Sequence, residues 1–207
     1  MMKVLVTGGA GFIGRWVVKY LLEREYNVWV LDNLSNGEKN NILEFEKNPC
    51  FNFVEGDILQ KDLLEDLFSV DFDICIHLAA AINVQNSIDN PEESFEVNLD
   101  GTFNILEKAK KRRTKVIFMS TCMVYKQAMD NKSIDENHPL CPLSPYAATK
   151  IAAENLVLSY YYSYGLPVAI LRPFNTYGPF QKTDNEGGVI PISVSYTHLT
   201  LPTICSV

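Results

Sequence analysis

Basic residues are scarce in this sequence relative to acidic ones. Its 207 residues include 18 Lys and Arg against 25 Asp and Glu, which gives a formal net charge of −7. That balance argues against a protein that follows the phosphate backbone of a nucleic acid, although backbone amides alone can still form a local anion site. Long hydrophobic runs are also missing, because no segment reaches the roughly 18 apolar residues of a membrane span. We expect neither a nucleic acid nor a membrane as a partner.

Targeting and metal-binding patterns are missing as well. The start of the chain, Met1-Met2-Lys3, leads straight into an apolar segment without a signal-peptide pattern. None of the cysteines falls in a CxxC pair; they are Cys50, Cys75, Cys122, Cys141 and Cys205. Their spacing fits no zinc site, and no His/Glu cluster has metal-ligand spacing. We therefore predict a cytoplasmic protein with free thiols and no metal.

What the sequence does contain is a regular alternation of apolar runs with helical patterns. The apolar runs, which are typical of buried strands, are Val4–Thr7, Val28–Leu31, Phe51–Glu55, Ile74–His77, Lys115–Ser120 and Val168–Leu171. The segments with helical spacing or helix-start signals are Phe12–Glu25, Gln60–Phe68, Pro91 to about Lys111, and Pro145–Tyr164. This alternation predicts an α/β fold, a doubly wound parallel sheet of the Rossmann type.

A glycine-rich turn follows the first predicted strand. Gly8, Gly11 and Gly14 have the spacing GxxGxxG and stand between a strand and a helix. Glycine lets the chain turn sharply, approach a pyrophosphate closely and pack a helix against a strand. The helix that begins near Phe12 would direct its free N–H groups at the phosphates. A dinucleotide site is favoured here over a simple glycine-rich hairpin.

Two carboxylates follow the next two strands. Asp32 ends the second strand, eighteen residues beyond Gly14, where a carboxylate can hold both ribose hydroxyls and repel a 2′-phosphate. This position favours NAD over NADP as cofactor; the alternative is a loop cap. Asp57, after Gly56, can accept a hydrogen bond from the adenine amino group, but Gly-Asp is also common turn chemistry.

Small residues follow the fourth predicted strand. His77 is followed by Leu78 and by three alanines, Ala79 to Ala81. Small side chains at a strand end let a cofactor approach closely. His77 stands alone at the end of an apolar strand, so we predict a structural role for it and not that of a base.

Tyr146 and Lys150 are candidates for proton chemistry. They are four residues apart on a predicted helix, so their side chains share a face. A phenol has a pKa of about 10, and a nearby ammonium has the right charge to lower it. Thr121, at the end of the fifth strand beside Ser120, can hydrogen-bond a substrate hydroxyl. A YxxxK pair alone is more often solvated surface; the glycine turn and these hydroxyls favour redox chemistry on a hydroxyl group.

The end of the chain breaks the pattern. Residues 193–207 (SVSYTHLTLPTICSV) have no clear period and follow no cap or turn signal. Part of this segment resembles a translated sequencing adapter, the alternative being a natural hairpin or tail. We predict one NAD-binding domain over residues 1–192 and a non-native tail over 193–207, poorly ordered and outside the sheet. We also expect the authentic protein to be longer.

Taken together, these motifs resemble the extended short-chain dehydrogenase/reductase family, and within it the NAD-dependent sugar-nucleotide epimerases and dehydratases. The motifs that carry the resemblance are TGGAGFIG (7–14), Asp32, Gly56-Asp57-Ile58, HLAA (77–80), VNLDGT (97–102), STCMVY (120–125), SPYAATK (144–150) and RPFNTYGP (172–179). They occur in the family's order and spacing over nearly all of residues 1–192.

The resemblance implies a role for each matching residue. Tyr146 would be the catalytic base and acid, Lys150 would hold the nicotinamide ribose, and Thr121 would complete the triad. Asn98 would help to position Lys150, and Asn175 would touch the substrate. The implied cofactor contacts come from Gly8, Gly11, Phe12, Ile13, Gly14, Asp32, Asn33, Asp57, Ile58, Leu78, Ala79, Ala80, Asn98, Tyr146 and Lys150.

The resemblance also implies a reaction and leaves alternatives open. Dehydratases of this family carry an Asp-Glu pair where this sequence has Cys122 and Met123, neither of which can protonate and remove water. This favours 4-epimerisation of an NDP-hexose, of the UDP-glucose/UDP-galactose type, through a 4-keto intermediate over 4,6-dehydration. A non-catalytic dinucleotide sensor would not need the Tyr146, Lys150 and Thr121 set. Family members are about half as long again, so we expect this chain alone to be inactive, and the full-length protein to be a homodimer.

Overall fold

The fold is a parallel sheet. The computed structural model describes residues 1–128, 133–183, 190 and 193. The six strands are β1 (Lys3–Thr7), β2 (Asn27–Asp32), β3 (Phe51–Glu55), β4 (Ile74–His77), β5 (Lys115–Met119) and β6 (Val168–Leu171). All neighbours are parallel, in the order β3-β2-β1-β4-β5-β6. The order reverses between β1 and β4, which confirms the predicted Rossmann-type sheet.

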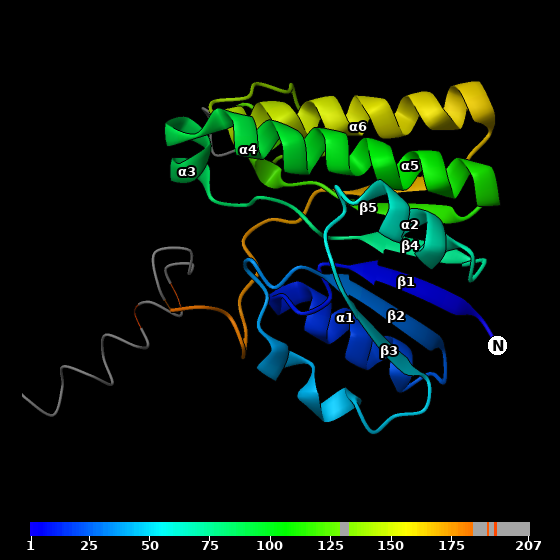
Figure 1. Cartoon of the computed structure of the whole chain (residues 1–207). Helices are drawn as coiled ribbons and strands as arrows, with labels where there is room; N and C mark the ends of the chain where they lie inside the picture. The colour runs from blue at the N-terminus through cyan, green and yellow to red at the C-terminus, as the bar shows by residue number, and fades with distance from the viewer. Residues whose placement is uncertain (129–132, 184–189, 191–192, 194–207) are drawn as a thin grey trace, which may run out of the picture. The chain divides into compact units, whose positions relative to one another are not determined.

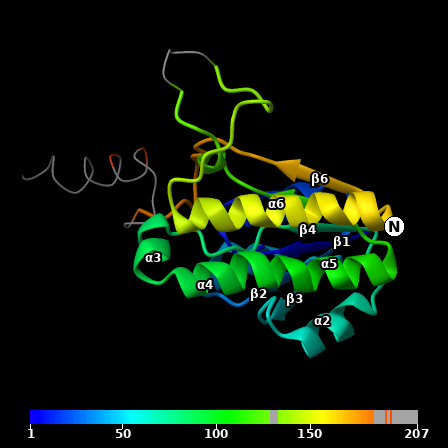
Figure 2. The ribbon, with the colours of Figure 1, turned by 90° about the horizontal axis from the view of Figure 1, so that it is seen from above.

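Helices cover both faces of this sheet (Figure 1). One face carries α1 (Phe12–Leu22) and two short 3₁₀ turns, η1 (Lys39–Asn41) and η2 (Leu43–Phe45). The other carries α2 (Lys61–Phe68), α5 (Gly101–Arg112) and α6 (Pro145–Tyr164). Figure 2 shows α5 and α6 side by side above the sheet. The chain divides into two compact units, residues 1–173 and 174–207, and all these elements belong to the first.

The alternation of side chains along β1 builds two separate cores. Val4 and Val6 belong to the cluster with Val18 of α1, whereas Leu5 belongs to the cluster with Leu64 of α2. Successive side chains of a strand point to opposite faces, so a strand covered on both sides must be apolar throughout. That is why the strands are continuous apolar runs in the sequence.

The predicted helix from Pro91 to about Lys111 is divided into three parts. It begins as α4 (Pro91–Phe95), continues as a π-helical turn, η3 (Glu96–Asp100), and then becomes α5. π-Helical turns are rare and often occur at functional sites. A further short helix, α3 (Val84–Asp89), precedes α4 and was not predicted. The predicted helix Phe12–Glu25 ends earlier, at Leu22.

The long helix α6 has the predicted bounds because both of its ends are capped. The Ser144 side chain accepts a hydrogen bond from the Ala147 N–H, and Pro145 occupies the first helical turn. Gly165 ends the helix in the left-handed conformation, at φ 66°. Serine before proline and glycine after the last turn are standard start and stop signals.

The predicted tail, 193–207, lies outside the described residues apart from Ser193. Its predicted lack of order and the predicted domain boundary near residue 192 therefore stay predictions. Among the helices of the described residues, none combines the length and apolar character that a membrane crossing requires.

Candidate active site

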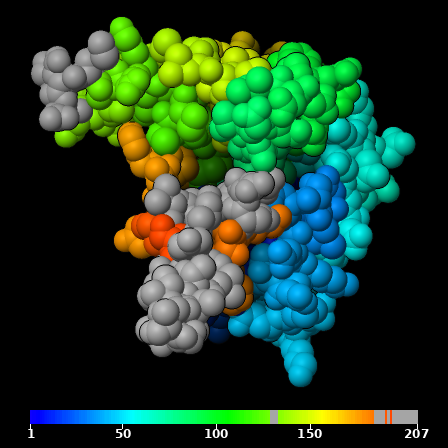
Figure 3. Space-filling model, turned by 90° about the vertical axis from the view of Figure 1, so that its left-hand side faces the viewer, coloured from blue at the N-terminus to red at the C-terminus, as the bar shows by residue number. Residues whose placement is uncertain are grey.

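The candidate site lies at the carboxyl edge of the sheet. Figure 3 faces that end of the first unit, with the green and yellow residues of α3 to α6 above and the blue residues of the first quarter of the chain below. Parallel strands deliver their following loops to one edge, which is where ligands of open α/β sheets bind. Most of the predicted site residues follow strands at this edge.

The glycine turn after β1 has no room for side chains at two of its three glycines. Gly8 has φ +72°, and a Cβ there would lie 2.7 Å from the Ala79 nitrogen. A Cβ on Gly14 would lie 2.2 Å from the Gly8 carbonyl oxygen. A Cβ on Gly11 would meet that same oxygen at 3.3 Å. The turn leads directly into α1 at Phe12 and Ile13, whose N–H groups belong to the unpaired first turn of the helix.

Asp32 is held between the glycine turn and its own loop. Its Oδ2 accepts from the Ala10 N–H at 2.9 Å, and its Oδ1 accepts from the Leu34 N–H at 2.9 Å. Burial raises the pKa of this carboxyl group, and the two backbone hydrogen bonds oppose that rise. Each carboxylate oxygen keeps a further lone pair, so the pair of oxygens can still accept from two hydroxyl groups.

Asn33 and Asp57 meet where the loops after β2 and β3 come together. Asn33 Nδ2 donates to Asp57 Oδ2 at 2.7 Å, and Asp57 Oδ1 accepts from the Leu59 N–H at 2.8 Å. The neighbouring Ile58 is buried, and its carbonyl accepts from Asn104 Nδ2 at 3.2 Å. The two predicted contacts Asn33 and Asp57 are therefore linked directly to each other.

His77 has the structural role that its sequence context predicted. It is buried, with Nδ1 2.7 Å from Thr7 Oγ1 and Nε2 3.1 Å from Thr102 Oγ1. Burial first, and the charge of Lys150 second, lower its pKa to about 3, so the ring is neutral. Beyond it, the half-buried Leu78 and Ala79 donate their N–H groups to the carbonyl and the hydroxyl of Thr7. Ala80, also half-buried, continues this segment along the edge.

Asn98 lies in the π-helical turn and joins it to two other segments. Its Oδ1 accepts from the Ala81 N–H at 2.8 Å, and its Nδ2 donates to the Ala81 carbonyl and to Thr149 Oγ1, each at 3.1 Å. Thr149 in turn donates to the Tyr146 carbonyl at 2.8 Å. Asn98 thus braces the backbone of α6 between Tyr146 and Lys150 through the Thr149 side chain.

Tyr146 and Thr121 lie together, as the sequence predicted. The Thr121 hydroxyl accepts from the Met123 N–H at 3.2 Å and shares a side-chain hydrogen bond with Tyr146. Burial raises the pKa of Tyr146, the Thr121 bond lowers it, and Cys122 raises it. The net rise runs against the expected lowering by Lys150, because desolvation of the phenolate outweighs the hydrogen bond in the protein alone.

Lys150 is almost fully buried, one helical turn after Tyr146. Its Nζ lies 4.4 Å from the centre of the Phe118 ring, and its exposed fraction is 3%. Burial lowers its pKa to about 7, while the carboxylate of Glu154 opposes that shift. An ammonium with so few polar partners suits a place where a ligand hydroxyl completes its hydrogen bonds.

Several supporting residues were not predicted. Ser87 of α3 accepts from the Tyr146 N–H at 3.2 Å and donates to the Val84 carbonyl at 2.6 Å, which fixes the start of α6. The buried Glu154, one helical turn after Lys150, forms an ion pair with the half-buried Arg172. No local pattern marks either contact, because their partners are distant in the sequence.

Two predictions are not tested by this geometry. Asn175 is exposed and belongs to the second unit, so its predicted contact with substrate stays a prediction. Within residues 1–128 and 133–183, no group of three or more His, Cys, Asp or Glu side chains could hold an ion, and the expected absence of a metal stays a prediction.

The residues present fit a dinucleotide. A turn that excludes any Cβ at Gly14 would let a phosphate approach its backbone N–H groups, and a carboxylate with free lone pairs ends β2. The triad of Thr121, Tyr146 and Lys150 lies at the same edge. This fold and site define the extended short-chain dehydrogenase/reductase class.

Comparison with known proteins places the chain more narrowly. Residues 4–204 match the family described as the NAD dependent epimerase/dehydratase family. The chain therefore belongs to that family, whose cofactor is NAD. The match runs into the segment predicted to be a non-native tail.

Three similar proteins illustrate the range of the family. The solved structure of Pal from Bacillus thuringiensis is 55% identical, with a TM-score of 0.94, and the similarity covers 96% of this chain and 64% of that one. A dTDP-glucose 4,6-dehydratase from Bacillus anthracis, solved in complex with NAD, is 34% identical, with a TM-score of 0.86 and coverage of 96% and 62%. The UDP-glucose 4-epimerase of Mycolicibacterium smegmatis is 37% identical over 192 residues, which are 92% of this chain and 61% of that protein. The chain thus spans about three fifths of its relatives' length.

Proposed function

We propose that the protein containing this chain is an NAD-dependent sugar-nucleotide 4-epimerase. The observation that carries the proposal is the meeting of Thr121 and Tyr146 one turn from Lys150, beside Cys122 and Met123. Enzymes of the family include both UDP-glucose 4-epimerases and dTDP-glucose 4,6-dehydratases. The substrate, the localisation in the cytoplasm and the inactivity of the 207-residue chain alone are parts of the same proposal.

The chain's own residues supply binding, orientation and proton transfer. Bound NAD would supply the acceptor and donor of the hydride at the sugar C4. Asp32 would hold the adenosine ribose, the glycine turn the pyrophosphate, and Lys150 the nicotinamide ribose. Thr121 would orient the C4 hydroxyl, and Tyr146 would take its proton and later give it back. The sugar passes through a 4-keto intermediate, so the same phenol must act as base and then as acid.

The two residues after Thr121 favour epimerisation. Dehydration at C5 and C6 needs an acid and a base beside the triad, and Cys122 and Met123 stand in their places. Cys122 is half-buried and Met123 is 43% exposed. The Met123 thioether can neither give nor take a proton, and the Cys122 thiol alone cannot serve as both the acid and the base that elimination needs. A non-catalytic sensor is less well supported, because it has no use for a Tyr, Thr and Lys set.

Product analysis tests the proposal. A protein of full family length that contains this chain should interconvert the 4-epimers of at least one sugar from a panel of UDP-, dTDP-, GDP- and CDP-sugars. The solvent-deuterium content of the product separates the reactions, because 4-epimerisation leaves C5 and C6 unexchanged. Accumulation of a 4-keto-6-deoxy sugar would replace the epimerase proposal with the dehydratase one.

Asp32 should make the protein prefer NAD to NADP. Its buried carboxylate would repel a 2′-phosphate, and two unit charges 4 Å apart at a protein surface interact by about 4 kcal/mol. We expect wild-type protein to bind NAD at least about tenfold more tightly, and Asp32→Asn to narrow that ratio. Calorimetric titration with both cofactors measures it. As a control, Asp57→Asn removes a carboxylate proposed to lie at the adenine end and should weaken the binding of NAD and NADP alike. Equal affinities of the wild-type protein for NAD and NADP would refute the assignment of NAD as the preferred cofactor.

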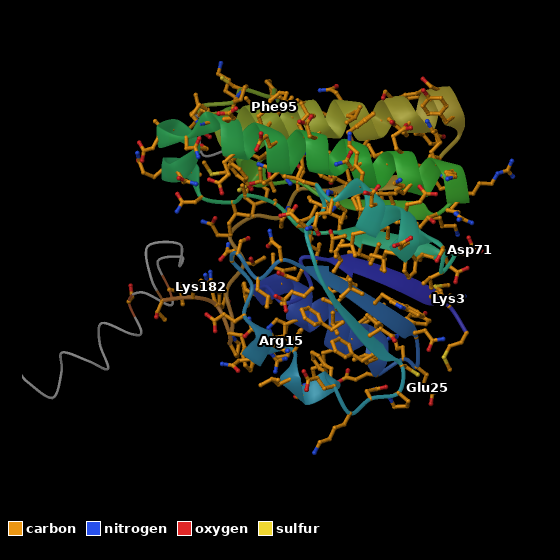
Figure 4. The ribbon with its side chains drawn as sticks, in the orientation of Figure 1. Lys3, Arg15, Glu25, Asp71, Phe95 and Lys182 are labelled. Atoms are coloured by element: carbon orange, nitrogen blue, oxygen red, sulfur yellow. The ribbon has the colours of Figure 1, made fainter. Side chains whose placement is uncertain are left out.

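We also propose that the full-length protein forms a homodimer through the α4 to α6 layer. These helices expose large apolar side chains, among them Phe95 at 49%, Phe103 at 41% and Tyr161 at 51%. Figure 4 marks Phe95 on this layer. Exposed apolar area of this kind is typical of a protein interface. Sedimentation of a monomer at micromolar concentration would contradict the proposal.

A further inference from the structure

An ion pair between a buried glutamate and a half-buried arginine lies one helical turn beyond Lys150. Glu154 follows Lys150 by four residues in α6, and its side chain is 3% exposed. Arg172, the first residue after β6, donates from Nε to Oε1 at 2.9 Å and from Nη2 to Oε2 at 2.6 Å. A bidentate pair fixes the orientation of the carboxylate plane and neutralises the carboxylate charge. Arg172 therefore determines where the negative charge of Glu154 points.

Arg172 is itself held from a second direction. Its Nη1 donates to the Tyr125 hydroxyl at 3.0 Å and to the Glu136 carbonyl at 3.4 Å. The guanidinium also lies over the Tyr125 ring, 4.9 Å from its centre. Tyr125 follows the turn that begins at Thr121. One guanidinium thus joins α6, the end of β6 and the segment that carries Thr121.

The surroundings of Lys150 supply little other charge. From β4 it faces His77, which is neutral, and from β5 it faces the Phe118 ring. On its own helix the titratable neighbours are Tyr146, one turn before it, and Glu154, one turn after it. The thiol of Cys122 acts on Tyr146 from the turn after β5. Glu154 is the group that opposes the effect of burial on the pKa of Lys150.

Glu154 lies on the same helix face as Lys150, yet it pairs with Arg172. In the part of the chain that the structure describes, no ion pair joins Glu154 to Lys150. We propose that Glu154 and Arg172 are positioning residues: Arg172 holds the Glu154 carboxylate away from Lys150, so that the Lys150 ammonium stays free to serve the Tyr146 end of the site. The part of this inference that concerns Tyr146 rests on the proposed function.

Removing either partner should change Lys150 in a defined direction. Without Arg172, the buried carboxylate of Glu154 has no counter-charge, and the ammonium one turn away becomes its nearest partner. The pKa of Lys150 then rises. Without the charge of Glu154, the Arg172 cation is left uncompensated nearby, so the pKa of Lys150 falls.

The test is a titration of Lys150 itself. Lysine labelled with ¹³C at Cε reports the protonation of Nζ by NMR, and Lys150→Arg assigns the signal. In the ligand-free protein we expect a midpoint near 7 for the wild type. Arg172→Met should raise it by about one pH unit and Glu154→Gln should lower it. The double variant should return close to the wild-type value, because it removes both charges of a net-neutral pair.

Arg112→Met is the matched control. Arg112 pairs with Asp71, whose side chain is 68% exposed, so its loss should leave the Lys150 midpoint unchanged. An unchanged midpoint in folded Arg172→Met protein, or shifts of Arg172→Met and Glu154→Gln in the same direction, would overturn the inference. Should Arg172→Met fail to fold, the Lys150 midpoint in Glu154→Gln is the test: a lower midpoint supports the inference and an unchanged one overturns it. A missing epimerase activity would refute the proposed function but leave this titration unaffected.

Discussion

Replacing Tyr146 with phenylalanine should lower turnover by about 10²–10⁴, the usual contribution of a positioned acid–base group. The ring of Tyr146 is 7% exposed and packs at the start of α6, so phenylalanine keeps its packing and loses only the oxygen. NAD binding should stay nearly intact. Steady-state turnover on the epimer that the sugar panel identifies, combined with calorimetric NAD titration, measures both effects.

A second tyrosine of the same helix serves as control. Tyr160 is also buried and lies near the end of α6, far from Tyr146. Its hydroxyl donates to Glu107 of α5. Tyr160→Phe removes one part-buried hydrogen bond without touching the site, so it should cost about 1 kcal/mol of stability and leave turnover unchanged. Wild-type turnover in Tyr146→Phe would show that the proton is transferred by another group.

Much of the fold could be predicted because its signals are local. Each strand is an apolar run, and α6 has a serine cap at Ser144 and a glycine stop at Gly165. The helix α3 could not be predicted, because its sequence VQNSID has no apolar period. It is held by the Asn83 cap and by the bond from the Tyr146 N–H to Ser87, a residue 59 positions earlier.

The candidate site was predictable where chemistry follows from spacing. Tyr146 and Lys150 share a helix face, and Asp32 ends a strand next to the glycine turn, so neighbouring residues alone indicate these positions. The supporting contacts depend on the folded chain. Asn98 braces Thr149 across 51 residues, and Arg172 meets Tyr125 across 47. The rise in the pKa of Tyr146 also escaped prediction, because burial is a property of the assembled site.

Gly14→Ala should abolish most of the NAD binding. The new Cβ would lie 2.2 Å from the Gly8 carbonyl oxygen and 2.6 Å from the Gly9 Cα, so backbone has to move. Forcing an extra carbon into packed structure costs about 1–3 kcal/mol. The segment that moves is the one proposed to bind the pyrophosphate through its N–H groups, so loss of affinity should exceed about a hundredfold. Calorimetric NAD titration and thermal unfolding measure affinity and stability separately.

Gly165→Ala separates a general loss of stability from a local effect on the turn. Gly165 has φ +66° and no heavy atom within 4 Å of an added Cβ, so alanine there meets backbone strain but no clash. A left-handed alanine costs about 1–2 kcal/mol, which is close to the expected loss at Gly14. Gly165 ends α6 at the opposite end from Tyr146, so NAD affinity should match the wild type. If both variants lose affinity equally, the Gly14 effect is one of stability, and the proposed contact between this turn and the pyrophosphate is wrong.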